Sequence, residues 1–283
     1  MVALISGYFD DSQSTGDVWV VAGYVGYANQ WEHLGRMWDE ALRAHDVPYF
    51  HKREMADPAG AFAKWLPPED HQEEVVAFFK DLVGAIRRCG VHIITSAVWV
   101  KDLERFNSEK GLILEPYPLA AYSCMSQIAL KHGDVPVTAV FDRVEKVDDK
   151  LRKARLYADT DRHAYPGLCN LVTSIPLEAG LTSRTVPALQ AADLIAWEVR
   201  KALFKMKPWQ LSDRPLAARE EQWQHYLEWT RESSGQDPFL RKSLDALISE
   251  VSFNSIVWDY QQISTTHDAR RGIWTEAVAE QQA

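Results

Sequence analysis

The fold of this chain starts from residues 2–11, which read VALISGYFDD. The apolar part of this run is short and rich in branched and aromatic residues, a composition that predicts a buried or half-buried strand. Asp10 and Asp11 follow it directly. Because successive residues of a strand face opposite sides of a sheet, we expect these two carboxylates to point in opposite directions.

A third aspartate, Asp193, interrupts a helix-forming stretch that is apolar nearly all the way round, ALQAADLIAW at residues 188–197. Such a helix is expected to be buried. An ionised carboxylate there is unfavourable unless it takes up a proton or gains a cation, an arginine or several hydrogen-bond donors. Gln190 lies one turn before Asp193 on the same face, so we expect it to be a hydrogen-bond partner that positions the carboxylate.

The composition is that of an ordinary globular protein. Of the 283 residues, 46% are hydrophobic and 25% are charged, and the net charge of -9 argues against a general nucleic-acid coat protein while leaving room for a local basic groove. No run reaches the roughly 20 apolar residues of a membrane helix, and no leader pattern precedes the first strand. We therefore expect a cytoplasmic protein without a membrane partner; its oligomeric state stays open.

The apolar periodicity alternates between strands and helices along the chain. Four strands are predicted after the first one, and the strand at 18–25 should form a hairpin with it because only a short polar connection separates them. The other strands are expected at 91–100, 135–141 and 170–175. The helices are expected at 29–45 with Asn29 as N-cap, 68–88, 118–132, 148–159 and 186–204.

This order predicts an α/β fold with one mixed central sheet of about five strands flanked by helices. Residues 1–207 would form this domain. Residues 208–283 would form a helical extension packed on it, with helices at about 216–231 and 238–249.

The predicted elements bring three carboxylates toward one edge of the sheet. Asp142 ends the strand at 135–141, as Asp10 ends the first strand, and if these strands are neighbours their ends lie side by side. The last helix would lay Asp193 across the same edge. Carboxylates without thiols or paired histidines favour Mg²⁺ or Mn²⁺, and phosphodiester hydrolysis uses one or two such ions.

Several motifs resemble the DUF3800 family. The residues YFDDS at 8–12 resemble its opening Asp-Glu-Ser signature, with Asp11 in place of Glu. His51 in YFHKRE at 49–54 resembles the early histidine of the family, and Asp142 in FDR at 141–143 its strand-end aspartate. Ser183 together with LQAADL at 189–194 resembles its closing Ser and Gln-x-x-Asp-Leu motif, so the resemblance runs from about residue 4 to 203.

The resemblance implies an RNase H-like fold and a metal-dependent nuclease. Under it, Asp10, Asp142 and Asp193 hold the metal, and His51 assists as a proton shuttle in catalysis. The supporting residues would be Asp11, Ser12, Glu54, Ser183 and Gln190. His51 and Glu54 are spaced to share one helical face.

One feature departs from the RNase H-like pattern. Such nucleases commonly carry a glutamate on the helix between the third and fourth strands, and here the helix at 118–132 contains no acid. Glu115 lies just before it. The missing ligand would then come from Asp11, Glu54 or Glu178, with Asp11 otherwise the first residue of a turn.

Basic residues near the ends of two predicted helices are candidates for phosphate contacts, namely Lys146, Lys150, Arg200 and Lys201. Charge runs on helices are more often solvated faces. A phosphoacceptor domain also pairs aspartates after its first strand, but a helix should follow there and a second strand is predicted instead. The main alternative to a nuclease is a catalytically inactive binding or scaffold module that keeps the fold.

Overall fold

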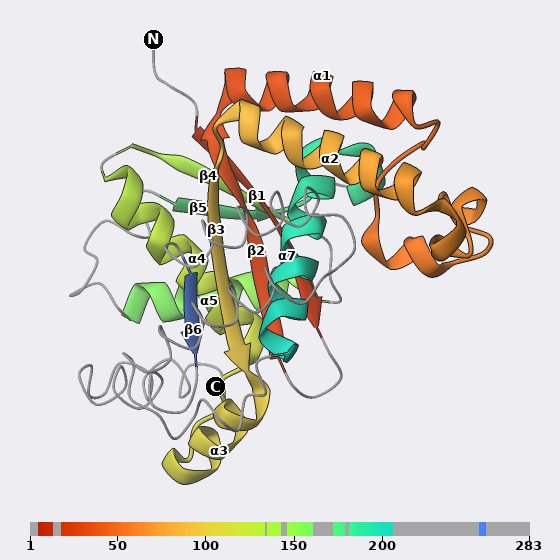
Figure 1. Cartoon of the computed structure of the whole chain (residues 1–283). Coiled ribbons are helices and arrows are strands. Elements are labelled where there is room, and N and C mark those ends of the chain that lie inside the picture. Colours follow the sequence, from red (N-terminus) through yellow and green to blue (C-terminus); the bar gives the residue numbers. More distant parts are fainter. Residues whose placement is uncertain are drawn as a thin grey trace.

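The computed structural model describes residues 5–13, 18–133, 135–142, 146–160, 172–178, 181–205 and 255–258. These residues form an α/β fold around one mixed sheet with helices on both faces (Figure 1). The sheet has six strands in the order β5-β4-β1-β2-β3-β6. The prediction of a mixed central sheet flanked by helices is confirmed.

The first three strands form an antiparallel meander. β1 (Ile5–Gln13) pairs with β2 (Val18–Tyr27), which pairs with β3 (His92–Trp99). β1 is longer than predicted: Asp10 and Asp11 lie within the strand, opposite Ala22 and Val21 of β2. The strand at 18–25 and its hairpin pairing with β1 are therefore confirmed, and Asp11 is not a turn residue.

Two more strands extend the sheet beside β1. β4 (Val137–Phe141) pairs in parallel with β1, and β5 (Val172–Pro176) pairs in parallel with β4. Parallel neighbours need a crossover connection, which helices provide here. β1 and β4 are thus adjacent near the middle of the sheet, as the convergence of Asp10 and Asp142 requires.

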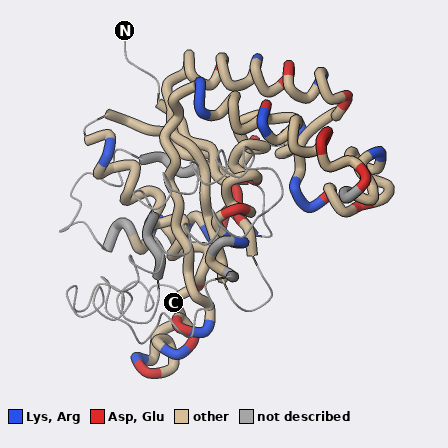
Figure 2. The backbone as a smooth tube through the Cα atoms, in the orientation of Figure 1, with Lys and Arg blue, Asp and Glu red and all other residues tan. Residues whose placement is uncertain are grey.

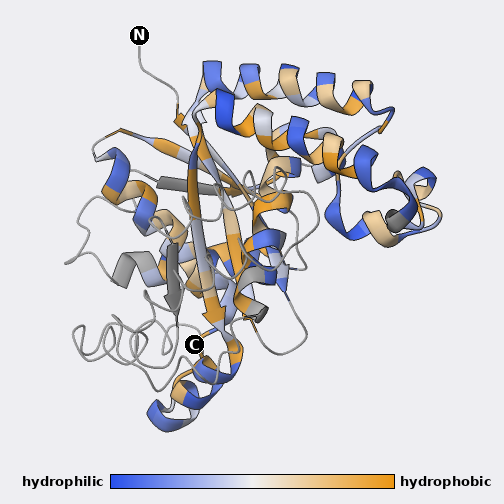
Figure 3. Ribbon diagram, viewed as in Figure 1, coloured by the Kyte–Doolittle hydropathy of each residue, from blue (hydrophilic) through white to orange (hydrophobic). Residues whose placement is uncertain are grey.

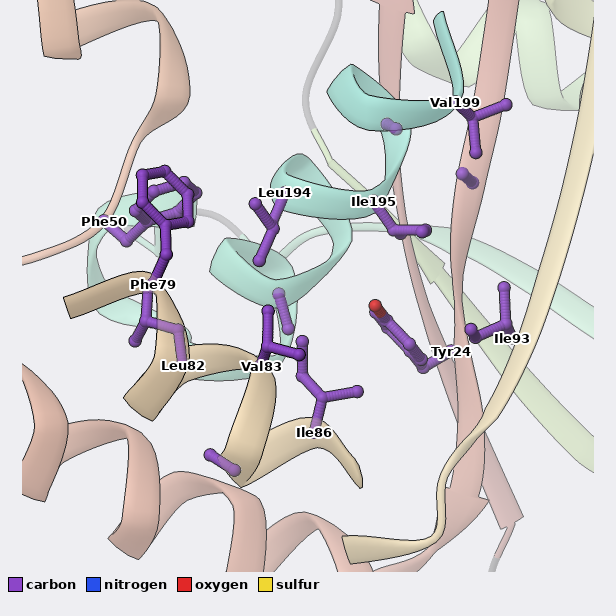
Figure 4. Packing of buried hydrophobic residues seen from close by; sticks show 14 of the residues in the cluster. Tyr24, Phe50, Phe79, Leu82, Val83, Ile86, Ile93, Leu194, Ile195 and Val199 are labelled. Carbon is purple, nitrogen blue, oxygen red and sulfur yellow. The ribbon is translucent and has the colours of Figure 1, made fainter. Parts of the chain in front are cut away.

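One face of the sheet is covered by α7 (Pro187–Lys205), with α1 (Ala28–Ala44) and α2 (Gln72–Cys89) beyond it (Figure 1). Figure 4 shows Ile195 of α7 near Tyr24 of β2, and Leu194 of α7 pointing toward Val83 of α2. α7 is almost entirely buried along its first half. This confirms the buried helix predicted around Asp193.

The opposite face is covered by α4 (Pro116–His132) and α5 (Val147–Thr160). Alternate residues of the strands divide between the two faces: Phe9 and Phe141 pack in the core under α4, whereas Ala22 and Tyr24 pack in the core under α7. Figure 3 shows the apolar strands between helices whose outer surfaces are hydrophilic. The alternation is the physical basis for assigning a face to each aspartate.

Several details differ from the predicted elements. α3 (Val100–Lys110) was not predicted, and it follows β3 directly with its polar face toward solvent. The N-cap of α1 is Tyr27 rather than Asn29, because the Gln30 side chain accepts a hydrogen bond from the Tyr27 N–H. Figure 2 shows blue and red segments interleaved on α1, α2 and α3.

Short 3-10 helices occupy the connection between α1 and α2 and the approach to α7. They are η1 (Lys52–Ala56), η2 (Ala63–Trp65), η3 (Pro68–His71) and η4 (Ser183–Thr185). Buried aromatic side chains, including Phe50, Phe62 and Trp65, pack with Phe78 of α2. These contacts fix the connection that carries His51.

Beyond α7 the structure describes β6 (Ser255–Trp258), which pairs in parallel with β3 at the edge of the sheet. A strand there corrects the expectation of helices alone after residue 208, because the edge of β3 offers unpaired backbone groups that a strand satisfies. The two helices predicted at 216–231 and 238–249, and the domain boundary at 207/208, lie outside the described residues. None of the described helices has both the length and the apolar character to span a membrane.

Candidate functional site

Asp10 and Asp142 lie side by side on the α7 face of the sheet. Phe9 is opposite Phe141 in the parallel β1–β4 pair, and the Asp142 N–H donates to the Phe9 carbonyl oxygen over 2.9 Å. The next residues along both strands are the two aspartates. Since Phe9 and Phe141 face the core under α4, alternation turns both carboxylates toward α7.

The Asp10 carboxylate also bends toward the edge where β4 ends. Its Oδ1 accepts the Asp11 N–H over 2.7 Å. The Phe9 carbonyl faces β4, and alternation directs the backbone groups of Asp11 to the same side, where β4 has already ended. Asp10 therefore satisfies a backbone donor that β4 does not reach.

Asp193 approaches these acids from α7. Its side chain is buried, and its Oδ2 accepts the backbone N–H of Lys52 over 2.6 Å. Burial raises the pKa of Asp193, and the charge of Asp142 raises it further, whereas the Lys52 N–H and the His51 imidazole lower it. Asp193 is therefore in electrostatic contact with the acids of the two strands.

The three carboxylates repel one another. Burial is the largest cause that raises the pKa of Asp10 well above its usual range, followed by the charges of Asp193, Asp142 and Asp11. Like charges in a poorly solvated place favour uptake of a proton or of a cation. Asp10, Asp142 and Asp193, called the acid cluster below, thus influence one another through their charges.

The donor set fits a hard divalent cation by its chemistry, because it consists of carboxylate oxygens carrying net negative charge. It is not a finished coordination shell: among the residues that the structure describes, no group of three His, Cys, Asp or Glu side chains is arranged closely enough to hold one ion. Asp10 and Asp193 each have one oxygen engaged by a backbone N–H. Metal binding would need a change of side-chain rotamer.

Asp11 faces the other side of the sheet, toward α4 and α5. Lys150 of α5 lies with its ammonium 5.2 Å from the ring centres of both Trp19 and Tyr117. Burial raises the pKa of Asp11 to about 6, opposed by the charge of Lys150 and reinforced by Asp142. Asp11 and Asp10 thus point to opposite faces, as predicted.

Tyr117 is a further group in this neighbourhood. It is buried at the start of α4 and makes an edge contact with Trp19. Burial raises its pKa well above the usual value, and the charges of Asp11 and Asp10 add to the effect. Sequence reasoning did not single out Tyr117, because an apolar helix start gives no sign of the strand it packs on.

His51 lies immediately before η1, in extended backbone, and its side chain is half-buried. Its Nδ1 is buried without a hydrogen-bond partner among the described residues and lies 4.0 Å from Glu54 Oε1. Since the imidazole lowers the pKa of Asp193, His51 is close to the acid cluster. His51 and Glu54 are therefore near each other, but not on one helical face as predicted, because His51 is extended and η1 begins only at Lys52.

Glu54 is committed to other partners. Tyr49 donates its hydroxyl to Glu54 Oε2 over 2.6 Å, and Arg184 forms an ion pair with Oε1 while its guanidinium lies 5.0 Å from the Tyr49 ring centre. Burial would raise the pKa of Glu54, but these two hydrogen bonds and the charge of Arg184 bring it below the usual value. Glu54 is therefore a structural anchor of η1.

Glu115 and Glu178 are the remaining acids that could replace the missing helix glutamate. Glu115 is the N-cap of α4 and pairs with Lys153 of α5, on the face opposite Asp10. Glu178 is exposed after β5. α4 itself carries no acid, whereas α7 carries a second buried carboxylate, Glu198, whose charge, like that of Asp193, raises the pKa of Lys52.

Gln190 does not position the Asp193 carboxylate, contrary to expectation. Its Oε1 accepts the Trp38 indole N–H over 2.9 Å and the Phe50 N–H over 2.7 Å, and its Nε2 donates to the Arg184 carbonyl over 3.0 Å. Ser183 begins η4, just before Arg184. Gln190 therefore ties α1, η4 and the segment before η1 to α7.

The four basic residues predicted to contact phosphate lie in different surroundings. Arg200 is half-buried two turns after Asp193, and its Nε donates to Ser12 Oγ over 2.9 Å, on the β1 face that also carries Asp10. Among the described residues it has no carboxylate partner. Lys201, in contrast, pairs with Glu198 and lies over the Trp197 ring.

Lys146 and Lys150 lie at the start of α5. Lys146 is exposed and adopts a positive φ of 56°. Lys150 lies over two aromatic rings on the Asp11 side. Arg200 is thus the basic candidate placed on the acid face of the sheet.

Lys52 is a residue that the sequence did not reveal. Its ammonium lies 4.5 Å from the Phe79 ring centre and 4.2 Å from that of Trp197, and burial lowers its pKa to about 8. Its backbone N–H binds Asp193. The contact between η1 and α7 shows that Lys52 binds Asp193. In the sequence, the position of Lys52 next to His51 was the sign that could have indicated it.

Comparisons with known proteins add no relative. No protein-family model, no curated protein and no solved structure matches this chain.

Proposed function

We propose that this protein is a Mg²⁺- or Mn²⁺-dependent nuclease with an RNase H-like fold that hydrolyses phosphodiester bonds of DNA or RNA in the cytoplasm. One observation carries the proposal: Asp10 and Asp142 stand next to each other on parallel neighbouring strands, under a helix that brings Asp193 to the same face. The resemblance of the surrounding motifs to the DUF3800 family supports it.

The strand arrangement supports the RNase H-like part of the proposal. Three antiparallel strands in chain order are followed by β4 and β5, which add in parallel on the far side of β1. This topology is what places the ends of the first and fourth strands together. β6 is an addition at the opposite edge.

The metal would be held by Asp10, Asp142 and Asp193. When bound, a divalent cation supplies a water of lowered pKa and stabilises negative charge on the phosphate oxygens. The charge of the three acids favours a cation over a neutral ligand. Because the rise in the pKa of Asp10 comes partly from the other two acids, a bound cation would also relieve their repulsion.

His51 and Arg200 would act on the substrate beside these acids. His51 has a half-buried imidazole near Asp193 and is placed to accept or return a proton. Arg200 is held at its Nε by Ser12, so its terminal nitrogens remain to bind a phosphate oxygen. A cation on the acid face would let the negatively charged backbone approach.

A second candidate function is a binding module that keeps the fold without cleaving nucleic acid. It is favoured by the incomplete coordination shell in the described residues and by the absence of an acid on α4. This protein would bind nucleic acid through Arg200 and use the acid cluster for a metal of structural character.

A two-part experiment tests the proposal. Crystals grown with Mn²⁺ should show anomalous density between Asp10, Asp142 and Asp193, and labelled single- and double-stranded DNA and RNA should be cleaved with Mn²⁺ but not with EDTA. Binding of metal without cleavage of any of the four substrates by the parent protein would favour the binding module. Absence of metal at the acids would overturn both metal-based functions.

A further inference from the structure

The segment that carries His51 is held to α7 by two side-chain acceptors. These lie three residues apart on α7 and bind N–H groups two residues apart in the segment. Gln190 Oε1 accepts the Phe50 N–H over 2.7 Å, and Asp193 Oδ2 accepts the Lys52 N–H over 2.6 Å. His51 between them has extended backbone, with φ -149° and ψ 114°. In such backbone alternate N–H groups point the same way, and helix residues three apart share a face.

The orientation of the Gln190 amide is fixed by its neighbours. Its oxygen meets two donors, Trp38 Nε1 and Phe50 N, and its nitrogen meets an acceptor, the Arg184 carbonyl. Exchanging the oxygen and the nitrogen would break all three hydrogen bonds at a buried position. The amide therefore sets a single register of residues 50–52 against α7.

The side chains on both sides of His51 are anchored as well. Phe50 is fully buried against Trp38 and Phe79, and the Lys52 ammonium lies over the Phe79 and Trp197 rings. His51 and Lys52 are both half-buried and both lower the pKa of Asp193, whereas Phe50 is fully buried. Since the Lys52 ammonium lies over two aromatic rings, His51 is the side chain near the acid cluster whose Nδ1 has no hydrogen-bond partner among the described residues.

We propose that Gln190 is a positioning residue for His51. In the Gln-x-x-Asp motif, Gln190 holds residues 50–52, and Asp193 both holds these residues and belongs to the acid cluster. Gln190 fixes the loop through the Phe50 amide. Asp193 fixes the loop with Oδ2 and keeps Oδ1 for the acid cluster. The catalytic consequence rests on the proposed nuclease function, whereas the positioning of residues 50–52 does not.

The test compares Gln190→Met with a matched control. Gln190→Met keeps the length of the side chain and removes its hydrogen bonds. Gln127→Met does the same to another glutamine that donates to a backbone carbonyl, that of Thr95, on the opposite face of the sheet. Hydrogen exchange of the full-length protein, followed by mass spectrometry, reports on each segment without metal or substrate.

Gln190→Met should speed exchange in peptides covering residues 49–55 at least tenfold, with little change in β1, β4 and α5, and Gln127→Met should leave 49–55 unchanged. An even increase over the whole chain would mean that Gln190 acts only as a core residue, and would overturn the inference. Unchanged exchange at 49–55 would overturn it too.

Activity gives the second readout. Gln190→Met should lower kcat at least thirtyfold while KM and the Mn²⁺ dissociation constant stay within threefold, because the acids keep their places. Gln190→Glu, protonated at this buried position, retains an acceptor for Phe50 and a donor for the Arg184 carbonyl, and should restore protection at 49–55 and most of kcat. It also carries the test if Gln190→Met fails to fold, since faster exchange at 49–55 in Gln190→Glu would contradict the proposed contact.

The two proposals fail in different ways. If the parent protein cleaves nothing, the nuclease function fails, and the exchange data still decide whether Gln190 holds residues 50–52. If the parent cleaves nucleic acid and Gln190→Met leaves kcat unchanged, the positioning role fails while the nuclease stands.

Discussion

Asp10 and Asp142 are neighbours because Phe9 and Phe141 are paired across the parallel strands β1 and β4. Adjacent strands lie about 4.8 Å apart, so two aspartates that follow such a pair on the same face share one small volume. The third acid, Asp193, enters from α7. Charge at this point is therefore concentrated by backbone pairing rather than by flexible side chains.

Removal of charge from this cluster should abolish a stabilising response to metal. For the parent protein, Mn²⁺ at about tenfold above its dissociation constant should raise Tm by about 3–5 °C. Asp10→Asn and Asp193→Asn should lose most of this rise; the amide introduced by Asp193→Asn keeps an acceptor for the Lys52 N–H, so the loop should stay in place. Glu104→Gln on exposed α3 should respond like the parent. Equal shifts in all variants in differential scanning fluorimetry would contradict a metal at the acids.

Asp11 should make stability fall as the pH rises toward neutrality. Its pKa is raised to about 6 in the folded protein, above the ordinary value of 3.8, so the folded state holds the proton more tightly. This contribution is complete below about pH 4 and is lost as the pH passes 6. Asp11→Asn should therefore raise the free energy of unfolding by about 1–2 kcal/mol at pH 7.5, after allowance for solvent screening, with no difference at pH 4. Urea titrations at both pH values measure this, and a gain independent of pH would refute the assignment.

Glu54 should show the opposite dependence. Its pKa is lowered by hydrogen bonds from Tyr49 and Arg184 despite burial, so it stabilises the folded state above pH 4.5 and loses this effect as the pH falls through the folded pKa. Glu54→Gln should cost about 1 kcal/mol at pH 7 and progressively less below pH 4. Mn²⁺ affinity measured by calorimetry should not change, and a large loss of affinity would make Glu54 a ligand after all.

The β1–β2 register should depend on Gly23. A Cβ at this position would lie 1.9 Å from the Tyr8 carbonyl oxygen, closer than any atoms can approach without a backbone shift. Gly23→Ala should lower the free energy of unfolding by about 3 kcal/mol or more, among the largest single-residue effects. Gly35→Ala in α1 is the matched control, because nothing lies within 4 Å of its Cβ and the helix gains up to about 1 kcal/mol. Chemical denaturation should separate the two in sign.

Arg200 should contribute a phosphate contact. In an Asp10→Asn background without cleavage, Arg200→Gln should weaken binding of a single-stranded oligonucleotide and reduce the slope of log K against log salt by about 0.7. Lys146→Gln, which removes an exposed lysine from the start of α5, should change neither quantity appreciably. Fluorescence anisotropy at several salt concentrations gives both numbers, and identical slopes for Arg200→Gln and the parent would place the phosphate elsewhere.

Much of the fold could be predicted from the apolar periodicity and the turn residues of the sequence. The hairpin at the start, the helices of the two layers and the buried stretch around Asp193 were predictable because apolar period and turn residues depend on near neighbours in the chain. α3 escaped prediction because it is short and polar. β6 escaped because a four-residue strand at an edge is chosen by its partner β3 rather than by its own sequence.

The site was predictable only in outline. The three acids could be named because each is an acid at the end of, or inside, an apolar element. The partners of Gln190 could not, since Trp38, Phe50 and Arg184 come from separate segments and their hydrogen bonds need no sequence pattern. The same holds for Tyr117, which lies on the Asp11 side of the sheet, and for Lys52, whose N–H binds Asp193.

The alternation of strands and helices and the opposite directions of Asp10 and Asp11 are encoded locally, because they depend on side-chain chemistry and on the two-residue period of a strand. The contacts of each acid depend instead on how distant elements pack. The parallel pairing of β1 with β4 placed Asp142 beside Asp10, and the packing of α7 brought Asp193 to them. Contacts between distant segments depend on how whole elements pack, so no local pattern encodes them.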